Sequence, residues 1–220
     1  VNDNDLAWSE KARDKHITKA INHISQMQLN SGAFSLWRGG SRPEPWLSMY
    51  AMEFLQEAKT KGYDVPETML IDGMDYVENL NVDTMSVRAY AMYLRTKYGN
   101  PDPGEARYLA SRLESKAYGV QSHVHLSATF GLLGDAQREQ NILSGIKGSN
   151  WTSWYRYDYR SRIRDKALLS YYVLNSASID SAYKAKVMEQ LEGLYQEAKN
   201  LRYISTQEKG WLLRLASINN

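Results

Sequence analysis

The segment 46–58 carries apolar residues on nearly every side of a helix. Its apolar members are Trp46, Leu47, Met49, Tyr50, Ala51, Met52, Phe54, Leu55 and Ala58. A helix that is apolar all round is either buried among other elements or spans a membrane. A span needs about 20 residues, whereas Ser48 and Glu53 interrupt this shorter stretch. The sequence therefore predicts a helix that is buried among other helices.

Helical segments along the chain alternate between mostly apolar and amphipathic. Mostly apolar helices are expected at 46–58, 85–98, 122–133, 161–174 and 205–216, and amphipathic ones begin near residues 8, 66, 105, 135 and 181. No segment shows the sustained period-two alternation of a strand, so no strands are expected. Two concentric rings of helices require such alternating pairs, whereas a solenoid would line a concave polar face with its inner helices. The predicted fold class is all-α, an α/α toroid with about five helix pairs.

The number of helix pairs suggests that one pair of the toroid is missing. Five pairs are one fewer than a closed toroid commonly has, and Val1-Asn2-Asp3-Asn4-Asp5 resembles a cut inside a longer protein. We expect residues 1–220 to form one helical domain that lacks its first helices. Apolar residues such as Leu212 and Leu215 should then be partly uncovered.

Composition excludes several classes of function. The net charge is only +2, and Lys and Arg are scattered, so the chain lacks the basic surface of a nucleic-acid-binding protein. The absence of cysteine removes disulfides, thiolate nucleophiles and cysteine metal sites. Tyr is frequent, with 16 residues, so a core built from it must provide partners for many hydroxyl groups.

The four histidines do not form a recognisable metal site. His16 and His23 are seven residues apart on the first helix, and His123 and His125 point to different sides of theirs because they are two residues apart. No acidic or cysteine ligands accompany them. Ser122 and Ser127 also lack the base and orienting acid of a catalytic triad. We therefore expect neither a metal nor a cofactor.

A run of charged residues begins the predicted helix at 161–174. Within Arg160–Lys166, Arg162 and Asp165 are three residues apart and could pair across one turn. The favoured interpretation is a solvated helix start, and the alternative is a binding surface.

Two aromatic loops each contain a carboxylate, Glu44 in one and Asp158 in the other. A glycan-processing α/α toroid would need two such groups about 5–10 Å apart. A glycosidase is therefore an alternative function, and a plain helical scaffold is another. Because neither acid lies in a recognisable motif, the chain is expected not to be an enzyme.

Several motifs resemble the thioester-containing helical domain of the α2-macroglobulin and complement superfamily. The loop Gly32-Ala33-Phe34-Ser35-Leu36-Trp37 and the helix start Pro45-Trp46-Leu47-Ser48 are similar to the family's G-x-F-S-x-(W/F) and (T/P)-W-L-(T/S) patterns. Two later segments resemble bacterial signatures: Ser161 to Leu168 resembles S-x-x-R-D-x-A-L, and Ser205 to Trp211 resembles S-T-Q-E-x-(A/G)-W. The motif positions are Gly32, Phe34, Trp37, Trp46, Arg164, Asp165, Gln207, Glu208 and Trp211.

The resemblance implies an α/α toroid in a bacterial protease-trapping inhibitor of the periplasm. Its partners would be target proteases and other domains of the parent chain, and only a lipid anchor elsewhere in that chain would link it to a membrane. The family's thioester motif, C-x-E-Q, lies before the matching region, and Gln207-Glu208 is not that motif. The resemblance therefore implies a domain that presents or shields a thioester formed elsewhere, or a packing and recognition module if none exists. The segment Leu80 to Thr84 lacks the histidine that assists transfer to hydroxyls in complement relatives.

Overall fold

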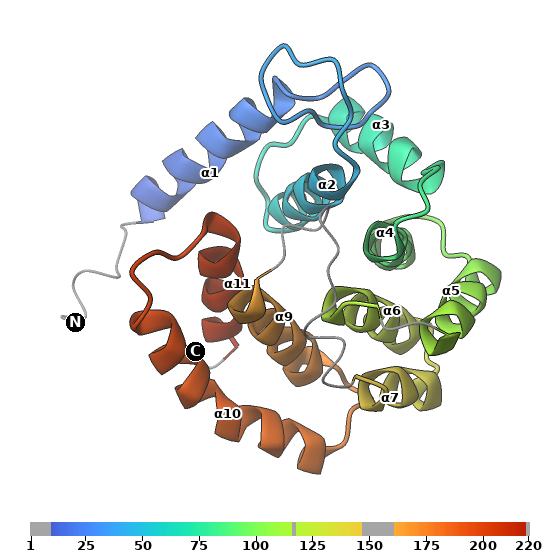
Figure 1. Cartoon of the computed structure of the whole chain (residues 1–220). Helices are drawn as coiled ribbons and strands as arrows, with labels where there is room; N and C mark the ends of the chain where they lie inside the picture. The colour runs from blue at the N-terminus through green and yellow to red at the C-terminus, as the bar shows by residue number, and fades with distance from the viewer. Residues whose placement is uncertain (1–9, 116–117, 147–160, 219–220) are drawn as a thin grey trace. The chain divides into compact units, whose positions relative to one another are not determined.

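The computed structural model describes residues 10–115, 118–146 and 161–218, and these residues form ten α-helices and no strand. Their only β-type pairing is an isolated bridge between Gln28 and Phe34. The helices are α1 (Glu10–Ser25), α2 (Pro45–Thr60), α3 (Glu67–Glu78), α4 (Met85–Tyr98), α5 (Pro103–Ser115), α6 (Val120–Leu132), α7 (Ala136–Ser144), α9 (Arg162–Asn175), α10 (Ser181–Lys199) and α11 (Thr206–Ala216) (Figure 1). The prediction of an all-α fold is confirmed. Among the described helices, none has the length and apolar character that crossing a bilayer requires.

The chain divides into two compact units, Val1–Val82 and Asp83–Asn220. Unit 1 contains α1 to α3, and unit 2 contains the described helices from α4 to α11. The α/α toroid with about five helix pairs and the single domain spanning residues 1–220, which lacks its first helices, stay predictions.

In unit 1, α2 packs against both α1 and α3. Half of its 16 residues are buried, which confirms the prediction made from its apolar composition. The loop before α2 is tied to α3, because Gln28 Nε2 donates to the carbonyls of Gly32 (3.2 Å) and Met69 (2.9 Å).

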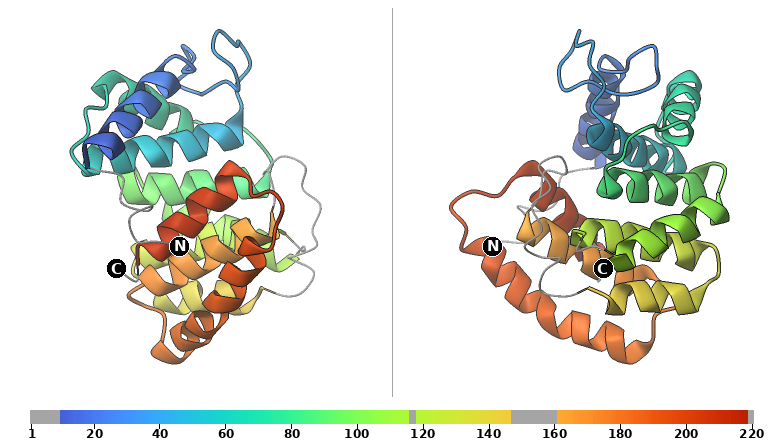
Figure 2. Two further views of the ribbon diagram at one scale, coloured as in Figure 1. Left: turned by 90° about the vertical axis from the view of Figure 1, so that its left-hand side faces the viewer. Right: turned by 45° about the vertical axis from the view of Figure 1, so that its right-hand side comes forward.

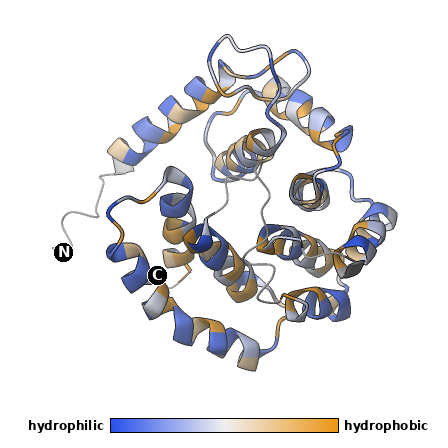
Figure 3. Ribbon diagram, viewed as in Figure 1, coloured by the Kyte–Doolittle hydropathy of each residue, from blue (hydrophilic) through white to orange (hydrophobic). Residues whose placement is uncertain are grey.

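In unit 2, α4, α6, α9 and α11 form a series in which each helix contacts the next (Figure 2). Outside this series, α5 packs against α4 and α6, α7 packs against α6, and α10 packs against α9. The series is the more buried set: nine of 14 residues are buried in α4, ten of 13 in α6 and seven of 14 in α9. Only two of nine residues are buried in α7 and four of 19 in α10, and hydrophilic and hydrophobic residues alternate along the ribbon of α10 (Figure 3).

The helix α11 departs from the predicted alternation. Only Trp211 and Leu215 of its 11 residues are buried, because it packs mainly on α9 and only one of its faces is covered. The expectation that Leu215 is partly uncovered was wrong, since this residue is fully buried. The exposed leucine is instead Leu213, which is 66% accessible, while Leu212 is half-buried.

Gly32 should be far less tolerant of substitution than Gly62, although both have positive φ angles, 82° and 85°. A Cβ at Gly32 would lie 1.9 Å from the carbonyl oxygen of Asp72, whereas nothing lies within 4 Å of one at Gly62. Gly62→Ala should therefore cost only the left-handed strain, about 1–2 kcal/mol. Gly32→Ala should cost clearly more, and urea denaturation of the two variants measures the difference. Equal losses would show that the α3 backbone yields without cost.

Candidate functional site

The nine motif positions lie in two groups, one in each unit. In unit 1, hydrogen bonds fasten the loop that contains Gly32 and Phe34 to the start of α2. The Phe34 N–H donates to Ser48 Oγ (2.8 Å), the Ser48 hydroxyl donates to the Glu44 carbonyl (2.8 Å), and the Glu44 N–H donates to the Phe34 carbonyl (2.9 Å). Phe34 and Trp46 are buried, and Trp46 stacks on Tyr50 with ring centroids 5.4 Å apart. These two aromatic side chains thus pack the junction of loop and helix.

Trp37 differs from the other motif positions of unit 1 because its side chain is 75% exposed. Its backbone is nevertheless held in place, since its carbonyl accepts hydrogen bonds from the Ser35 hydroxyl (2.8 Å) and from the Gly40 N–H (2.9 Å). The neighbouring Leu36 is also exposed. This loop therefore presents an indole to the surface on a fixed backbone.

The carboxylates of the glycosidase alternative can be followed only in part. Glu44 precedes the first residue of α2, where burial raises its pKa although the nearby charge of Arg42 lowers it. Burial also raises the pKa of Tyr76, and the charge of Glu44 adds to that rise. Asp158 lies outside the described residues, so the separation of the two acids stays untested.

In unit 2, Arg164 and Asp165 form an ion pair inside the protein. Arg164 is fully buried and Asp165 is 2% exposed. Arg164 Nε donates to Asp165 Oδ1 (2.8 Å), Nη2 lies 2.6 Å from the same oxygen, and Nη1 donates to Gln121 Oε1 on α6 (3.4 Å). A buried guanidinium is tolerated only when it is paired and hydrogen-bonded in this way.

The expectation for this charged run was therefore wrong in two respects. Asp165 pairs with its neighbour Arg164 rather than with Arg162, and the side chains of Arg164 and Asp165 are buried rather than solvated. Arg162 is exposed, and its Nε lies 3.9 Å from Glu197 Oε1 on α10. The cause is tertiary: α9 begins after Ser161, and from there Arg164 reaches Gln121 on α6.

Glu208 joins the two bacterial motifs. Its Oε1 accepts a hydrogen bond from the hydroxyl of Ser161, which caps α9, and its Oε2 accepts one from the backbone N–H of Ser205, which caps α11 (2.7 Å). The Ser205 hydroxyl in turn accepts from the Glu208 N–H (3.3 Å), which completes a capping box. One carboxylate thus ties together the first turns of α9 and α11.

The electrostatic balance at Glu208 favours the charged carboxylate. Burial raises its pKa, but the hydrogen bonds from Ser161 and Ser205 and the positive charge of Arg164 together outweigh burial and lower it. Gln207 is half-buried, and its Oε1 accepts no hydrogen bond among the described residues.

Trp211, the last motif position, belongs to an aromatic cluster in unit 2 that the sequence analysis missed. The cluster comprises Tyr90, Tyr93, His125, Tyr171, Tyr172 and Trp211, from α4, α6, α9 and α11. His125 stacks on Tyr90 with ring centroids 4.0 Å apart, and Trp211 lies 5.8 Å from Tyr171 and 5.9 Å from Tyr172. The available signal was a pair of tyrosines in each of two segments predicted to be mostly apolar, Tyr90 and Tyr93 in one and Tyr171 and Tyr172 in the other.

The histidines of α6 have separate surroundings, as their spacing predicted. His123 Nδ1 lies 3.1 Å from the Gly119 carbonyl, and burial lowers the pKa of this imidazole although that hydrogen bond opposes the shift. Across the described ranges, no three His, Cys, Asp or Glu residues are grouped as metal ligands would be.

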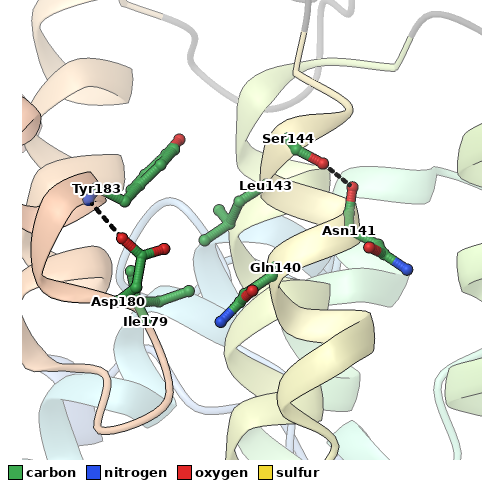
Figure 4. A pocket seen from close by; sticks show the side chains of 7 residues that line it. All are labelled: Gln140, Asn141, Leu143, Ser144, Ile179, Asp180 and Tyr183. Carbon is green, nitrogen blue, oxygen red and sulfur yellow. Dashed lines mark hydrogen bonds between the residues drawn. The ribbon is translucent and has the colours of Figure 1, made fainter.

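A small pocket lies between α7 and the start of α10 (Figure 4). It is lined by Gln140, Asn141, Leu143, Ser144, Ile179, Asp180 and Tyr183 and has a volume of about 200 Å³. Asp180 Oδ1 accepts the Tyr183 N–H (2.8 Å) and the Ser144 hydroxyl donates to the Asn141 carbonyl (2.9 Å), so these polar groups serve the helix ends. Sites for small ligands are usually about 300–1,000 Å³, so the dimensions and chemistry of this pocket do not suit substrate binding.

Breaking the buried ion pair should destabilise the protein strongly. Asp165→Asn should cost about 3–5 kcal/mol, because it removes the carboxylate that pairs directly with the buried Arg164 guanidinium. Adding Arg164→Met should recover part of that loss, since the double variant buries no net charge. Chemical denaturation of both, with the exposed Asp64→Asn as control, measures the effect. A double variant less stable than the single one would contradict this account.

The depressed pKa of Glu208 should make part of the stability dependent on pH. Because its folded pKa lies below its ordinary value of 4.5, its contribution is complete above that value and is lost as the pH falls through the folded pKa. Glu208→Gln keeps a capping-box side chain without the charge. The gap in unfolding free energy between the parent and this variant should therefore be largest near neutral pH and shrink below about pH 4. A gap that does not change with pH would show that the charge is immaterial.

Comparison with known proteins identifies relatives of this chain. No family model matches it. It is 29% identical to α2-macroglobulin of Escherichia coli over 94% of this chain and 13% of that protein. It is thus far shorter than the curated relatives that it matches. The expectation that the chain is not an enzyme agrees with this likeness.

Solved structures extend the likeness to the fold. A mutant of Salmonella α2-macroglobulin matches with a TM-score of 0.79 and 25% identity, covering 97% of this chain and 15% of that one. E. coli α2-macroglobulin activated by porcine elastase matches with a TM-score of 0.76 and 25% identity, covering 96% of this chain and 20% of that one. This coverage reaches both units, and the likeness agrees with the resemblance seen in the motifs. The chain is therefore similar, over nearly its whole length, to a helical domain of the bacterial α2-macroglobulins.

Proposed function

We propose that this chain is the helical domain of a bacterial α2-macroglobulin-type protease inhibitor and that it serves there as a rigid module. The observation that carries this proposal is the network around Glu208. Arg164, Asp165 and Glu208 belong to two separate motifs, yet hydrogen bonds and charge link them between α9 and α11. Groups engaged in this way hold helices together and do not attack a substrate.

The thioester part of the proposal assigns this chain a supporting role. The 220 residues contain no cysteine, so they cannot provide the thiol of a thioester. The domain would shield or present a thioester formed by residues outside this sequence, or pack against neighbouring domains where none is formed. The exposed indole of Trp37 is the motif residue best placed for such a contact within unit 1.

The proposed partners are proteases and other domains of a longer parent protein. Support comes from relatives: the E. coli protein has been solved after activation by trypsin and by porcine elastase. Cleavage in the parent would trigger a rearrangement that encloses or covalently captures the protease. A periplasmic location of the parent is part of the same proposal.

Trapping can be tested on the full-length protein that carries this chain. After incubation with trypsin, we expect the protease to co-elute with it in gel filtration. The bound trypsin should keep its activity on a small chromogenic peptide and lose most of its activity on casein, because enclosure excludes large substrates only. Asp165→Asn should weaken trapping, whereas the exposed Asp64→Asn should not. Trypsin that elutes alone with full activity on casein would refute the proposal.

The two roles of the domain can be separated by the type of complex formed. If a thioester is present, methylamine should release a free thiol, and part of the trypsin should stay attached in denaturing gels. Since the described sequence has no cysteine, that thiol would come from outside these 220 residues. Trapping without a released thiol or a covalent complex would instead assign the domain to packing and recognition.

A further inference from the structure

A second and larger pocket lies within unit 2, where the ends of α4, α6 and α9 meet α7. Its volume is about 400 Å³, within the usual range for sites that bind small molecules. The residues that matter for its chemistry are Tyr93, Lys97, Glu139, Tyr171, Tyr172 and Asn175. The pocket therefore combines aromatic walls with one acidic and one basic side chain.

Glu139 is the unusual member of this pocket. It is only 3% exposed, and its Oε1 accepts a hydrogen bond from the Ser176 hydroxyl (2.6 Å). Its second oxygen, Oε2, accepts none among the described residues, and no ion pair with a described Lys, Arg or His neutralises it. A position in the first turn of α7 offsets part of the charge. A buried carboxylate oxygen without a donor is otherwise costly, so this one is suited to accept a donor from a ligand.

The space beside Glu139 is kept open by Gly131 on α6. A Cβ at that position would lie 2.7 Å from Oε1 and 2.9 Å from Oε2 of Glu139. The carboxylate thus lies against the backbone of α6, and Glu139 is among the most buried residues that line the pocket, whereas Asn175 and Lys97 are exposed.

The tyrosine walls suit a cation. Tyrosine faces attract ammonium groups, and the pocket already contains an ammonium group beside a tyrosine, since Lys97 Nζ donates to the Tyr93 hydroxyl (3.0 Å). The Tyr171 and Tyr172 rings meet edge to face, 5.4 Å apart, and add apolar surface. A ligand with an ammonium group on a short apolar body would match these walls and the carboxylate beyond them.

We propose that this pocket binds a small organic ammonium ion, with its amino group on Glu139 and its apolar part against Tyr171 and Tyr172. Such a ligand supplies both the missing hydrogen-bond donor and the missing counter-charge. Two sources share this chemistry, a simple amine and a free amino acid. In the amino acid, the carboxylate would lie toward Lys97 at the exposed rim. This site is independent of the protease-trapping function proposed above.

The first test compares four probes of similar size by isothermal titration calorimetry on the full chain. They are phenethylammonium, phenylalanine, 2-phenylethanol and 3-phenylpropionate. We expect binding by the two probes that carry an ammonium group, and about tenfold to hundredfold weaker binding by the neutral alcohol, as the loss of a charge-assisted hydrogen bond implies. Equal affinity for the alcohol, or preference for the carboxylate probe, would overturn the proposal.

Variants then test the assigned residue. Glu139→Gln should lower the affinity for phenethylammonium by about tenfold or more. Glu189→Gln makes the same charge change at an exposed position outside the pocket and should leave that affinity unchanged. Gly131→Ala, which displaces the carboxylate, should weaken binding as well, and it keeps the test valid if Glu139→Gln fails to fold. Unchanged affinity in either folded variant would contradict the role of Glu139.

The variant Lys97→Met distinguishes the two sources of the ammonium group, a simple amine and a free amino acid. If the ligand is a free amino acid, this variant should lower the affinity for phenylalanine and leave that for phenethylammonium unchanged or higher. If it is a simple amine, phenylalanine should bind the parent no better than phenethylammonium and lose nothing in the variant. In both results Glu139 binds the ammonium group. If Lys97→Met abolished the binding of both probes, a role of Glu139 separate from that of Lys97 would be contradicted.

Discussion

The ion pair between Arg164 and Asp165 is the contact on which the packing of unit 2 depends. It lies where α9 leaves its cap, reaches Gln121 on α6, and its positive charge extends to Glu208 at the start of α11. Burying these charges costs desolvation free energy. The ion pair and its hydrogen bonds offset that cost only if the three helices keep their relative positions. The pair therefore contributes less to total stability than an apolar substitute could, but it specifies which helix ends meet. Either charged residue of the pair, buried without the other, would therefore destabilise the protein.

The sequence was sufficient to predict the helical fold. Apolar periodicity predicted the buried helices α2, α4, α6 and α9, and the spacing of Ser205 and Glu208 is that of the capping box that the structure contains. These features are local, because they depend on residues within a few turns of one another. The failure at α11 has the opposite origin: its burial depends on how many neighbouring helices cover it, and no pattern within Thr206–Ala216 encodes that number.

The candidate site was predictable only as a set of motif positions. The sequence placed Arg164, Asp165 and Glu208 in two motifs but could not show that Ser161 donates across 47 positions to Glu208. It paired Asp165 with Arg162 by helical spacing, whereas the side chain of Arg164 folds back onto its neighbour because α6 covers that face. The pocket around Glu139 was invisible for the same reason, since its walls come from helices far apart in the chain. Frequent tyrosine was the one early sign, and part of it is explained by the aromatic cluster that joins α4 to α11.

The loop that carries Trp37 has a further consequence for recognition. Its backbone is fixed before any partner arrives, by hydrogen bonds from Ser35 and Gly40 to the Trp37 carbonyl. An indole has only two side-chain torsions to immobilise, so a surface that covers it pays little conformational entropy and gains a large apolar contact area. Tryptophan on a pre-organised loop is thus the type of residue from which a binding hot spot is made. Affinity at this loop would then depend mainly on the shape of the partner's cavity, since the backbone of the loop is already ordered.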